Sequence, residues 1–469
     1  MTVAQPEPVA LGTAQGRWLV AVTVLASGMA FIDATAVQVA LPSIGRELDA
    51  SLSGLQWTIS GYTLALASLI LLGGSLGDRY GRRRVFLVGV VWFAVASLVC
   101  GLAQTTEQLV GARILQGIGG ALLTPGSLAL IQSSFRPADR ARAIGLWSAL
   151  AGIAGLIGPF LGGLLVDAVS WRLVFLLNVP VAALILAVAG RHVPESRDGG
   201  GHGRFDVLGA ALGIVTLGAT TYALIAAGDD ALRPDVLGAG VLGIAAGIGF
   251  VVRERRAADP MLPLGLFADR QFTGANLATL AVYGALGGSS LFLVLQLQTV
   301  LGYDATAAGA AMLPAILVIT LLSPTAGTLA ARIGPRLPMT VGPLVVATGT
   351  LLLVPVDGDG PYVLEVLPGS LLQGLGMAIT VTPLTATVLA AAPDAFAGIA
   401  SGVNNATARA AQLLAVAALP VAVGLSGDDY TQPLAFTHGY RTAMVACAVA
   451  FAVGGALSWW TIRNDVLRA

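Results

Sequence analysis

Three ionisable residues lie deep inside apolar stretches of this 469-residue chain: Asp33, Arg113 and Arg409. An ionised group is costly in a hydrocarbon layer, so such a residue usually carries an ion or binds a substrate. Burial favours the neutral form of an aspartate, whereas a nearby arginine favours its ionised form. A carboxyl group held between these influences can exchange a proton. Asp33 is therefore our candidate for proton coupling, with Arg113 as its partner.

The depths of Asp33 and Arg113 support this pairing. Asp33 lies 16 residues beyond Arg17, or about 24 Å along a helix, and Arg113 lies 6 residues beyond Glu107, or about 9 Å. Both therefore fall in the outer half of a hydrocarbon core about 30 Å thick. A static pair that only joins the two helices is the alternative.

The composition predicts a membrane protein. Only 11% of the residues are charged, against about 25% in globular chains. His192, His202 and His438 all fall in polar connectors, which excludes histidine as a proton carrier or metal ligand within the membrane. We expect no metal, no cofactor and no enzymatic activity, and energy drawn from the proton gradient.

Polar breaks divide the chain into fourteen apolar segments. Each is expected to be a transmembrane α-helix, because backbone groups in lipid need internal partners. The predicted fold is therefore an all-α polytopic membrane protein. The approximate bounds of the segments are 17–41, 54–76, 85–104, 107–131, 143–167, 171–190, 207–227, 235–252, 273–300, 306–330, 338–355, 362–390, 398–424 and 439–462.

The arginines orient these segments. With a cytoplasmic N-terminus, nineteen of the 25 arginines fall on the cytoplasmic side, four fall outside and two lie within segments. Cytoplasmic loops are enriched in positive charge, so both termini are predicted to be cytoplasmic, in the cell (inner or plasma) membrane.

The second half of the chain repeats the first. "GSLGDRYGRR" (74–83) matches "GTLAARIGPR" (327–336), and "LQGIGGALLTP" (115–125) matches "LQGLGMAITVTP" (372–383). Segments 1–6 thus correspond to segments 9–14, and segments 7–8 are inserted. Duplicated six-helix bundles are typical of transporters, which bind substrate where the repeats meet. The predicted parts are a cytoplasmic tail (1–16), a six-helix bundle (17–190), a linker (191–206), the inserted pair (207–252), a cytoplasmic loop (253–272), a second six-helix bundle (273–462) and a tail (463–469).

Four motifs resemble the fourteen-helix drug:proton antiporters of the major facilitator superfamily. "GSLGDRYGRRRVF" (74–86) is similar to the superfamily's loop signature between helices 2 and 3. "IDATAVQVALP" (32–42), "GLWSALAGIAGLIGPFLGG" (145–163) and "WRLVFLLNVP" (171–180) resemble signatures of helices 1, 5 and 6. The helix-1 motif departs from the pattern at Gln38, where asparagine is usual.

The resemblance implies two functional regions outside the Asp33–Arg113 pair. The cytoplasmic turn would form an inner gate, with Asp78 against the start of the thirteenth helix near residue 398. Glycine at 81 allows the tight turn itself. The residues of this predicted inner gate are Asp78, Arg79, Gly81, Arg82 and Asp139. A glycine-rich helix 5 would limit leak during exchange, through Gly145, Gly158, Pro159, Gly162 and Gly163.

Polar residues within the helices are the candidates for a substrate cavity: Gln38, Gln116, Gln373, Asn405 and Arg409. The glutamines are equally suited to helix–helix hydrogen bonds, and Arg409 to a structural role. Asp33, Arg113 and Arg409 together give a formal charge of +1, which favours a neutral, zwitterionic or anionic amphiphile.

The sequence therefore predicts a proton-coupled exporter of amphiphilic drugs that works by alternating access. Its partners would be small amphiphiles, protons and membrane lipids, with no nucleic acid, and we expect a monomer. An exporter of one lipid or secreted metabolite is the main alternative. A proton-independent facilitator or a non-transporting receptor is the remote one.

Overall fold

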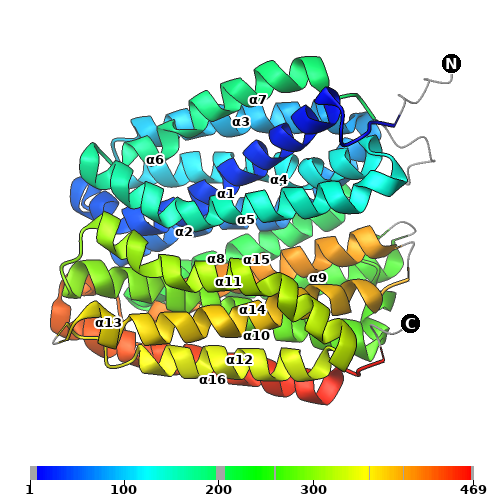
Figure 1. The fold of residues 1–469 in the computed structure, drawn as a ribbon. Helices are drawn as coiled ribbons and strands as arrows, with labels where there is room; N and C mark the ends of the chain where they lie inside the picture. The colour runs from blue at the N-terminus through cyan, green and yellow to red at the C-terminus, as the bar shows by residue number, and fades with distance from the viewer. Residues whose placement is uncertain (1–7, 197–205, 258–259, 359, 394–395, 466–469) are drawn as a thin grey trace. The chain divides into compact units, whose positions relative to one another are not determined.

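The structure is a computed structural model that describes residues 8–196, 206–257, 260–358, 360–393 and 396–465. Within these ranges it is helical and has no strand, apart from an isolated β-bridge between Val9 and Phe135. The chain divides into two compact units, Met1–Asp49 with Gly61–Phe205, and Ala50–Ser60 with Asp206–Ala469. The helices are labelled in Figure 1.

The first unit contains the helices that place the Asp33–Arg113 pair. They are α1 (Ala14–Leu48), the greater part of α2 (Leu52–Tyr80), α3 (Arg82–Leu102), α4 (Thr106–Ser134), α5 (Pro137–Ala168), α6 (Arg172–Leu176) and α7 (Asn178–His192).

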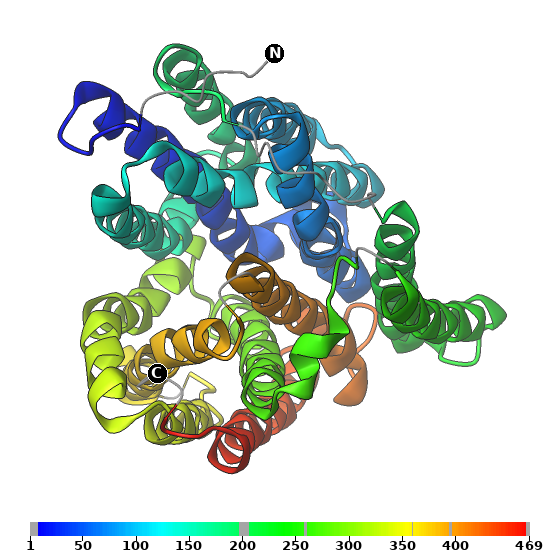
Figure 2. The same cartoon turned by 90° about the vertical axis from the view of Figure 1, so that its right-hand side faces the viewer.

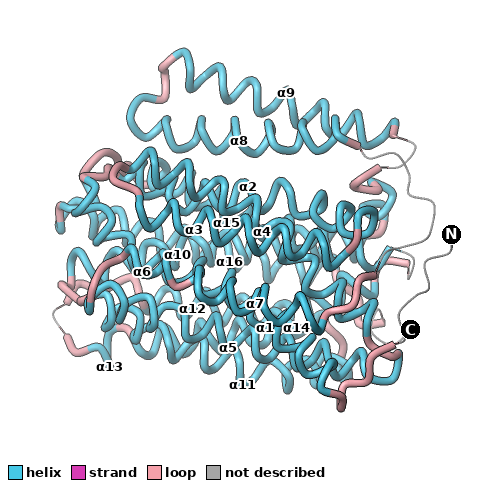
Figure 3. The backbone as a smooth tube through the Cα atoms, turned by 90° about the horizontal axis from the view of Figure 1, so that it is seen from above, coloured by secondary structure: helices cyan, strands magenta, loops and turns pink. Residues whose placement is uncertain are grey.

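The second unit begins with the first turns of α2, because Gln56 Nε2 donates hydrogen bonds to the carbonyl groups of Val416 (2.8 Å) and Ala417 (3.1 Å). Its α8 and α9 lie side by side as a hairpin (Figure 3), and Figure 2 shows α10 to α16 nearly end-on. Its elements are α8 (Val207–Asp230), α9 (Pro234–Arg256), the short 3₁₀ helix η1 (Leu264–Ala268), α10 (Arg270–Leu295), η2 (Gln296–Val300), α11 (Ala305–Ile333), α12 (Arg336–Leu352), α13 (Tyr362–Glu365), α14 (Leu367–Ala390), α15 (Ala397–Ala422), the short 3₁₀ helix η4 (Asp429–Thr431) and α16 (Pro433–Thr461).

Each of the fourteen predicted segments lies on a helix, but fewer qualify as membrane spans. Eleven described helices are long and apolar enough to cross a membrane, and α2 is a twelfth if its 50° bend near Leu72 is counted within one span. α12 is only 17 residues long, and α15 is not among the eleven despite its 26 residues. A fold of about eleven to twelve apolar helices is established, and the count of fourteen stays a prediction.

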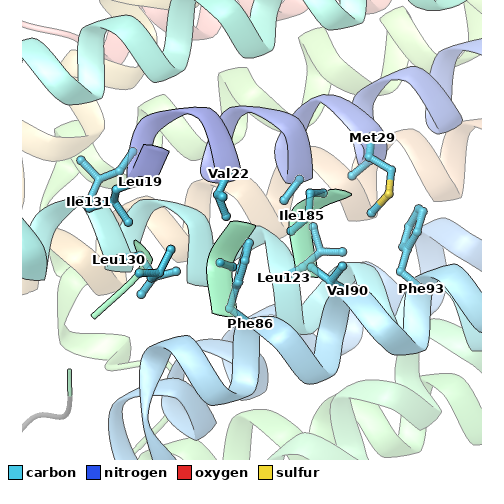
Figure 4. Packing of buried hydrophobic residues seen from close by; sticks show 14 of the residues in the cluster. Leu19, Val22, Met29, Phe86, Val90, Phe93, Leu123, Leu130, Ile131 and Ile185 are labelled. Atoms are coloured by element: carbon cyan, nitrogen blue, oxygen red, sulfur yellow. The ribbon is translucent and has the colours of Figure 1, made fainter. Parts of the chain in front are cut away.

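The core of the first unit lies between α1, α3, α4 and α7. Figure 4 shows Leu19, Phe86, Leu123 and Ile185 among the side chains that meet there, and each is fully buried. This packing fixes the spacing between the helices that carry the polar side chains farther along the same bundle.

The segment before α1 is bound to the first unit. Val9 donates a backbone hydrogen bond to Ser134 (2.8 Å) and accepts one from Arg136 (3.2 Å), and its side chain is buried. Of the predicted tail 1–16, residues 1–7 lie outside the described residues, as do 197–205 of the predicted linker. The described part of the tail thus covers the turn between α4 and α5.

The glycines of α5 differ in what surrounds them. A Cβ on Gly162 would lie 2.5 Å from Ala36 Cβ and 2.7 Å from its Cα, and one on Gly158 would meet Thr35 and the backbone of Ile32. A Cβ on Gly145 or Gly152 would meet nothing within 4 Å. Gly158 and Gly162 therefore form a small-xxx-small face that lets α1 and α5 approach closely.

We expect Gly162→Val to lower the melting temperature of the purified protein by several degrees, because overpacking costs about 1–3 kcal/mol. Gly152→Val on the same helix is the matched control and should melt close to the wild type. Equal melting temperatures for the two variants, measured by thermal unfolding in detergent, would contradict this account of the helix contact.

Candidate functional site: a buried ion pair between α1 and α4

Asp33 and Arg113 form an ion pair inside the first unit. Arg113 Nη1 lies 2.5 Å from Asp33 Oδ2, and the two side chains are 1% and 0% exposed. α1 and α4 pack against each other, and each presents its charged residue to this contact. The proximity predicted from their depths is what the structure shows.

Further donors complete the coordination of the Asp33 carboxylate. Its Oδ1 accepts hydrogen bonds from Gln116 Nε2 (2.7 Å) and Asn178 Nδ2 (3.0 Å). Both amides also donate to Ser97 Oγ, at 2.8 and 3.2 Å. Each oxygen of the Asp33 carboxylate therefore has at least one protein donor.

Aromatic rings cover the other side of the pair. The Arg113 guanidinium lies 4.4 Å from the ring centroid of Tyr62 on α2 and 5.6 Å from that of Phe175 on α6. A cation over an aromatic face is attracted to it, and more strongly where water is absent. The pair is thus enclosed by side chains from α1, α2, α3, α4, α6 and α7.

This arrangement allows a specific chemistry. A proton on Asp33 would remove the charge that balances Arg113, and an uncompensated buried guanidinium is strongly unfavourable. The ion pair therefore links the packing of α1 on α4 to the charge of Asp33.

The sequence reasoning did not find Ser97 and Asn178. Asn178 stands inside the quoted "WRLVFLLNVP" motif, where α6 ends and α7 begins, so a signal was present. Ser97 lies in an otherwise apolar run of α3, and nothing in its sequence neighbourhood distinguishes it. Only the packing of α3 beside α4 and α7 reveals its role.

The other predicted cavity glutamines make different contacts. Gln116 is part of the buried cluster, where its Oε1 accepts from Arg113 Nη1 (2.5 Å). Its repeat partner Gln373 donates to Thr350 Oγ1 on α12 (2.9 Å). This hydrogen bond between helices is the predicted alternative to a role in the substrate cavity. Gln38 is partly exposed on α1.

The turn between α2 and α3 depends on a glycine. Gly81 has φ +111°, a conformation that favours glycine, as expected for a tight turn. A Cβ there would lie 2.7 Å from Glu195 Oε1. Glu195 accepts a hydrogen bond from the backbone N–H of Arg83 (3.1 Å), so the chain after α7 covers the start of α3. Sequence reasoning missed Glu195.

The charged residues of the predicted inner gate have separate partners. Arg82 pairs with Asp78 (2.8 Å), whereas Asp139 pairs with Arg136 (3.0 Å) and accepts from the Leu11 N–H (3.1 Å). Arg82 and Asp139 thus have separate partners among the described residues, and the inner gate stays a prediction. Arg79 lies over the Tyr80 ring. The contact of Asp78 with the helix near residue 398 stays a prediction.

The family follows from comparison with known proteins. The family model of the Major Facilitator Superfamily matches residues 23–416. The chain belongs to this superfamily. It is a multi-pass membrane protein of a transporter family and not an enzyme.

The relatives within the superfamily are resistance proteins. The chain is 39% identical over 393 residues to the multidrug resistance protein Stp of Mycobacterium tuberculosis, covering 82% of this chain and 72% of the relative. It is 35% identical to the tetracenomycin C resistance and export protein of Streptomyces glaucescens, covering 89% and 76%.

A solved structure shows the same fold. The inward-facing crystal structure of a bacterial homolog of the human lysosomal transporter Spinster matches with a TM-score of 0.68, over 96% of this chain and 97% of that one. At 17% sequence identity it supports the fold alone.

We expect Asp33→Asn and Arg113→Gln each to lower the free energy of unfolding by about 3–5 kcal/mol, because each leaves one member of a buried pair without its partner. The double variant should lose less than the sum of the two. The measurement is a double-mutant cycle of denaturant unfolding on purified protein. Additive losses would show that the pair contributes no coupling energy.

Proposed function

We propose that this protein is a proton-coupled exporter of amphiphilic drugs, in which Asp33 carries the coupling proton. The observation that carries the proposal is the buried Asp33–Arg113 pair. It is supported by relatives that confer multidrug resistance and that export an antibiotic. Both termini would lie on the cytoplasmic side of the plasma membrane.

The coupling follows from the electrostatics of the pair. With Asp33 ionised, the carboxylate and three donors, on Arg113, Gln116 and Asn178, hold α1, α4 and α7 together. When Asp33 accepts a proton, Arg113 loses its counter-charge and the contact weakens. A substrate that favours one of the two arrangements shifts the proton occupancy of Asp33, since binding to one state displaces the equilibrium between them.

Export of a single compound is the second candidate. One relative is named for tetracenomycin C alone, whereas another is named for multidrug resistance. The fold and coupling are the same in both cases. The two differ in how many unrelated compounds lose their toxicity when the protein is expressed in a sensitive host.

Proton movement on addition of substrate tests the coupling. We would reconstitute the protein in vesicles with an internal pH dye, impose a pH gradient, and add amphiphiles of each charge type. We expect substrate-triggered proton movement in wild type and none with Asp33→Asn. Glu107→Gln is the matched control, because Glu107 is an exposed carboxylate at the outer end of α4, and should behave as wild type.

The results distinguish the proposals. A response that persists with Asp33→Asn would assign the proton to another carboxylate, with Glu365 and Asp167 next in line. Because the substitution also weakens the fold, the variant must first elute as a single species by size exclusion. No proton movement with any compound in wild type would overturn broad proton-coupled export.

A further inference from the structure

A second intramembrane arginine lies at the middle of α15. Arg409 is 12 residues after Ala397 and 13 before Ala422, or about 18 and 20 Å from the two ends. Its side chain is partly buried. A charge at this depth is the most costly that a membrane helix can carry.

Arg409 stands within a polar stripe. Ser401, Asn405, Arg409 and Gln412 are spaced by 4, 4 and 3 residues, which places them on one face of the helix. Leu413 and Val416, which continue this face at the same spacing, are buried and apolar, so the polar stripe is confined to residues 401–412. Polar faces of this kind do not face lipid, and they line the protein interior or a water-filled cavity.

The polar side chains of this stripe form no hydrogen bond or ion pair with another described helix. Among the described residues, Arg409 has no ion pair, and neither Arg409 nor Gln412 has a hydrogen bond. Asn405 donates only to the Ser401 carbonyl of its own helix (3.3 Å). Asn404, the next residue, shows the contrast, because it donates to Thr279 Oγ1 (2.7 Å) on α10. Asn404 is thus hydrogen-bonded to α10, whereas Asn405 and Arg409 make no hydrogen bond to another described helix.

Tyr283 of α10 lies beside this face. Its phenol is close enough to the Arg409 guanidinium for an electrostatic interaction, and its side chain is partly buried. α10 packs closely on α15, where a Cβ on Gly287 would lie 3.1 Å from Gln412 Cα. The Arg409 guanidinium and the Tyr283 phenol therefore lie on helices that pack together, and no described carboxylate pairs with Arg409.

The contrast with Arg113 gives the inference. Arg113 is balanced by Asp33, whose two oxygens are already occupied. Arg409 has no such partner, and an unpaired guanidinium inside a membrane is tolerated when an anion can neutralise it. The planar guanidinium matches the two oxygens of a carboxylate in a bidentate contact.

We infer that Arg409, with Tyr283, Asn405 and Gln412, is a carboxylate-binding subsite, and that the protein's substrates are amphiphilic carboxylic acids. This rests on the proposed export function and names its substrate class. The amides and the phenol supply hydrogen bonds to the acid and to oxygens close to it. The apolar body of the substrate needs no charged contact.

The test compares three probes with the same apolar body: pyrenebutanoic acid, its primary amide and the corresponding amine. Binding to the purified protein in nanodiscs is followed by pyrene fluorescence anisotropy. We expect wild type to bind the acid about tenfold more tightly than the amide, as a charged hydrogen-bonded pair provides, and to bind the amine most weakly.

Substitutions at Arg409 should act on the charge preference. Arg409→Gln should reduce the ratio of acid to amide affinity to about one, whereas Arg409→Lys should keep part of the preference, because lysine retains the charge without the fork. Arg46→Gln, at the exposed outer end of α1, is the control and should keep the wild-type ratio.

Equal binding of the three probes, binding of none, or an acid preference that survives Arg409→Gln would overturn the inference. The same probes in the proton-movement assay separate it from the proposed function. Proton movement triggered by the amine without an acid preference would leave the export function standing and refute the subsite. Selective binding of the acid without proton movement would support the subsite and refute proton-coupled export.

Discussion

The free-energy cost of a charge in an apolar medium is the constraint on which the rest of this structure depends. Asp33 and Arg113 avoid most of that cost by neutralising each other, and Gln116, Asn178 and Ser97 supply the remaining hydrogen bonds. These groups come from four helices, so the electrostatic requirement is also a packing requirement.

The duplicated halves meet this constraint differently. The position that aligns with Arg113 is Ser370, which is buried and uncharged, and Gln373 bonds Thr350 instead of a carboxylate. The second unit therefore needs no internal counter-charge on α14. Arg409 stands on α15 and has no ion pair or hydrogen bond among the described residues. The two halves thus differ in where their charged residues lie.

Contacts between segments distant in the sequence stabilise the turns between α2 and α3 and between α4 and α5. The turn at Gly81 is covered by Glu195, and the segment at Val9 bonds the turn that follows α4. The Asp139 carboxylate accepts a hydrogen bond from the Leu11 N–H and forms an ion pair with Arg136. The charged residues of this region therefore pair with close neighbours. The predicted orientation of the helices rests on the positions of the arginines and needs no network of ion pairs among them.

The sequence by itself determined the helices, the repeat and the superfamily, because these depend on local hydropathy and on motifs that are contiguous in the chain. Helical rise placed Asp33 and Arg113 at similar depths, and the resemblance to the superfamily, in which helices 1 and 4 line the cavity, made them a pair. Only the tertiary structure brought in Ser97 and Glu195, which nothing local distinguishes, and showed that Asn178 of the quoted motif donates to Asp33. It also decided that Gly158 and Gly162, but not Gly145, lie against α1, because the rotation of a helix about its axis is set by its neighbours.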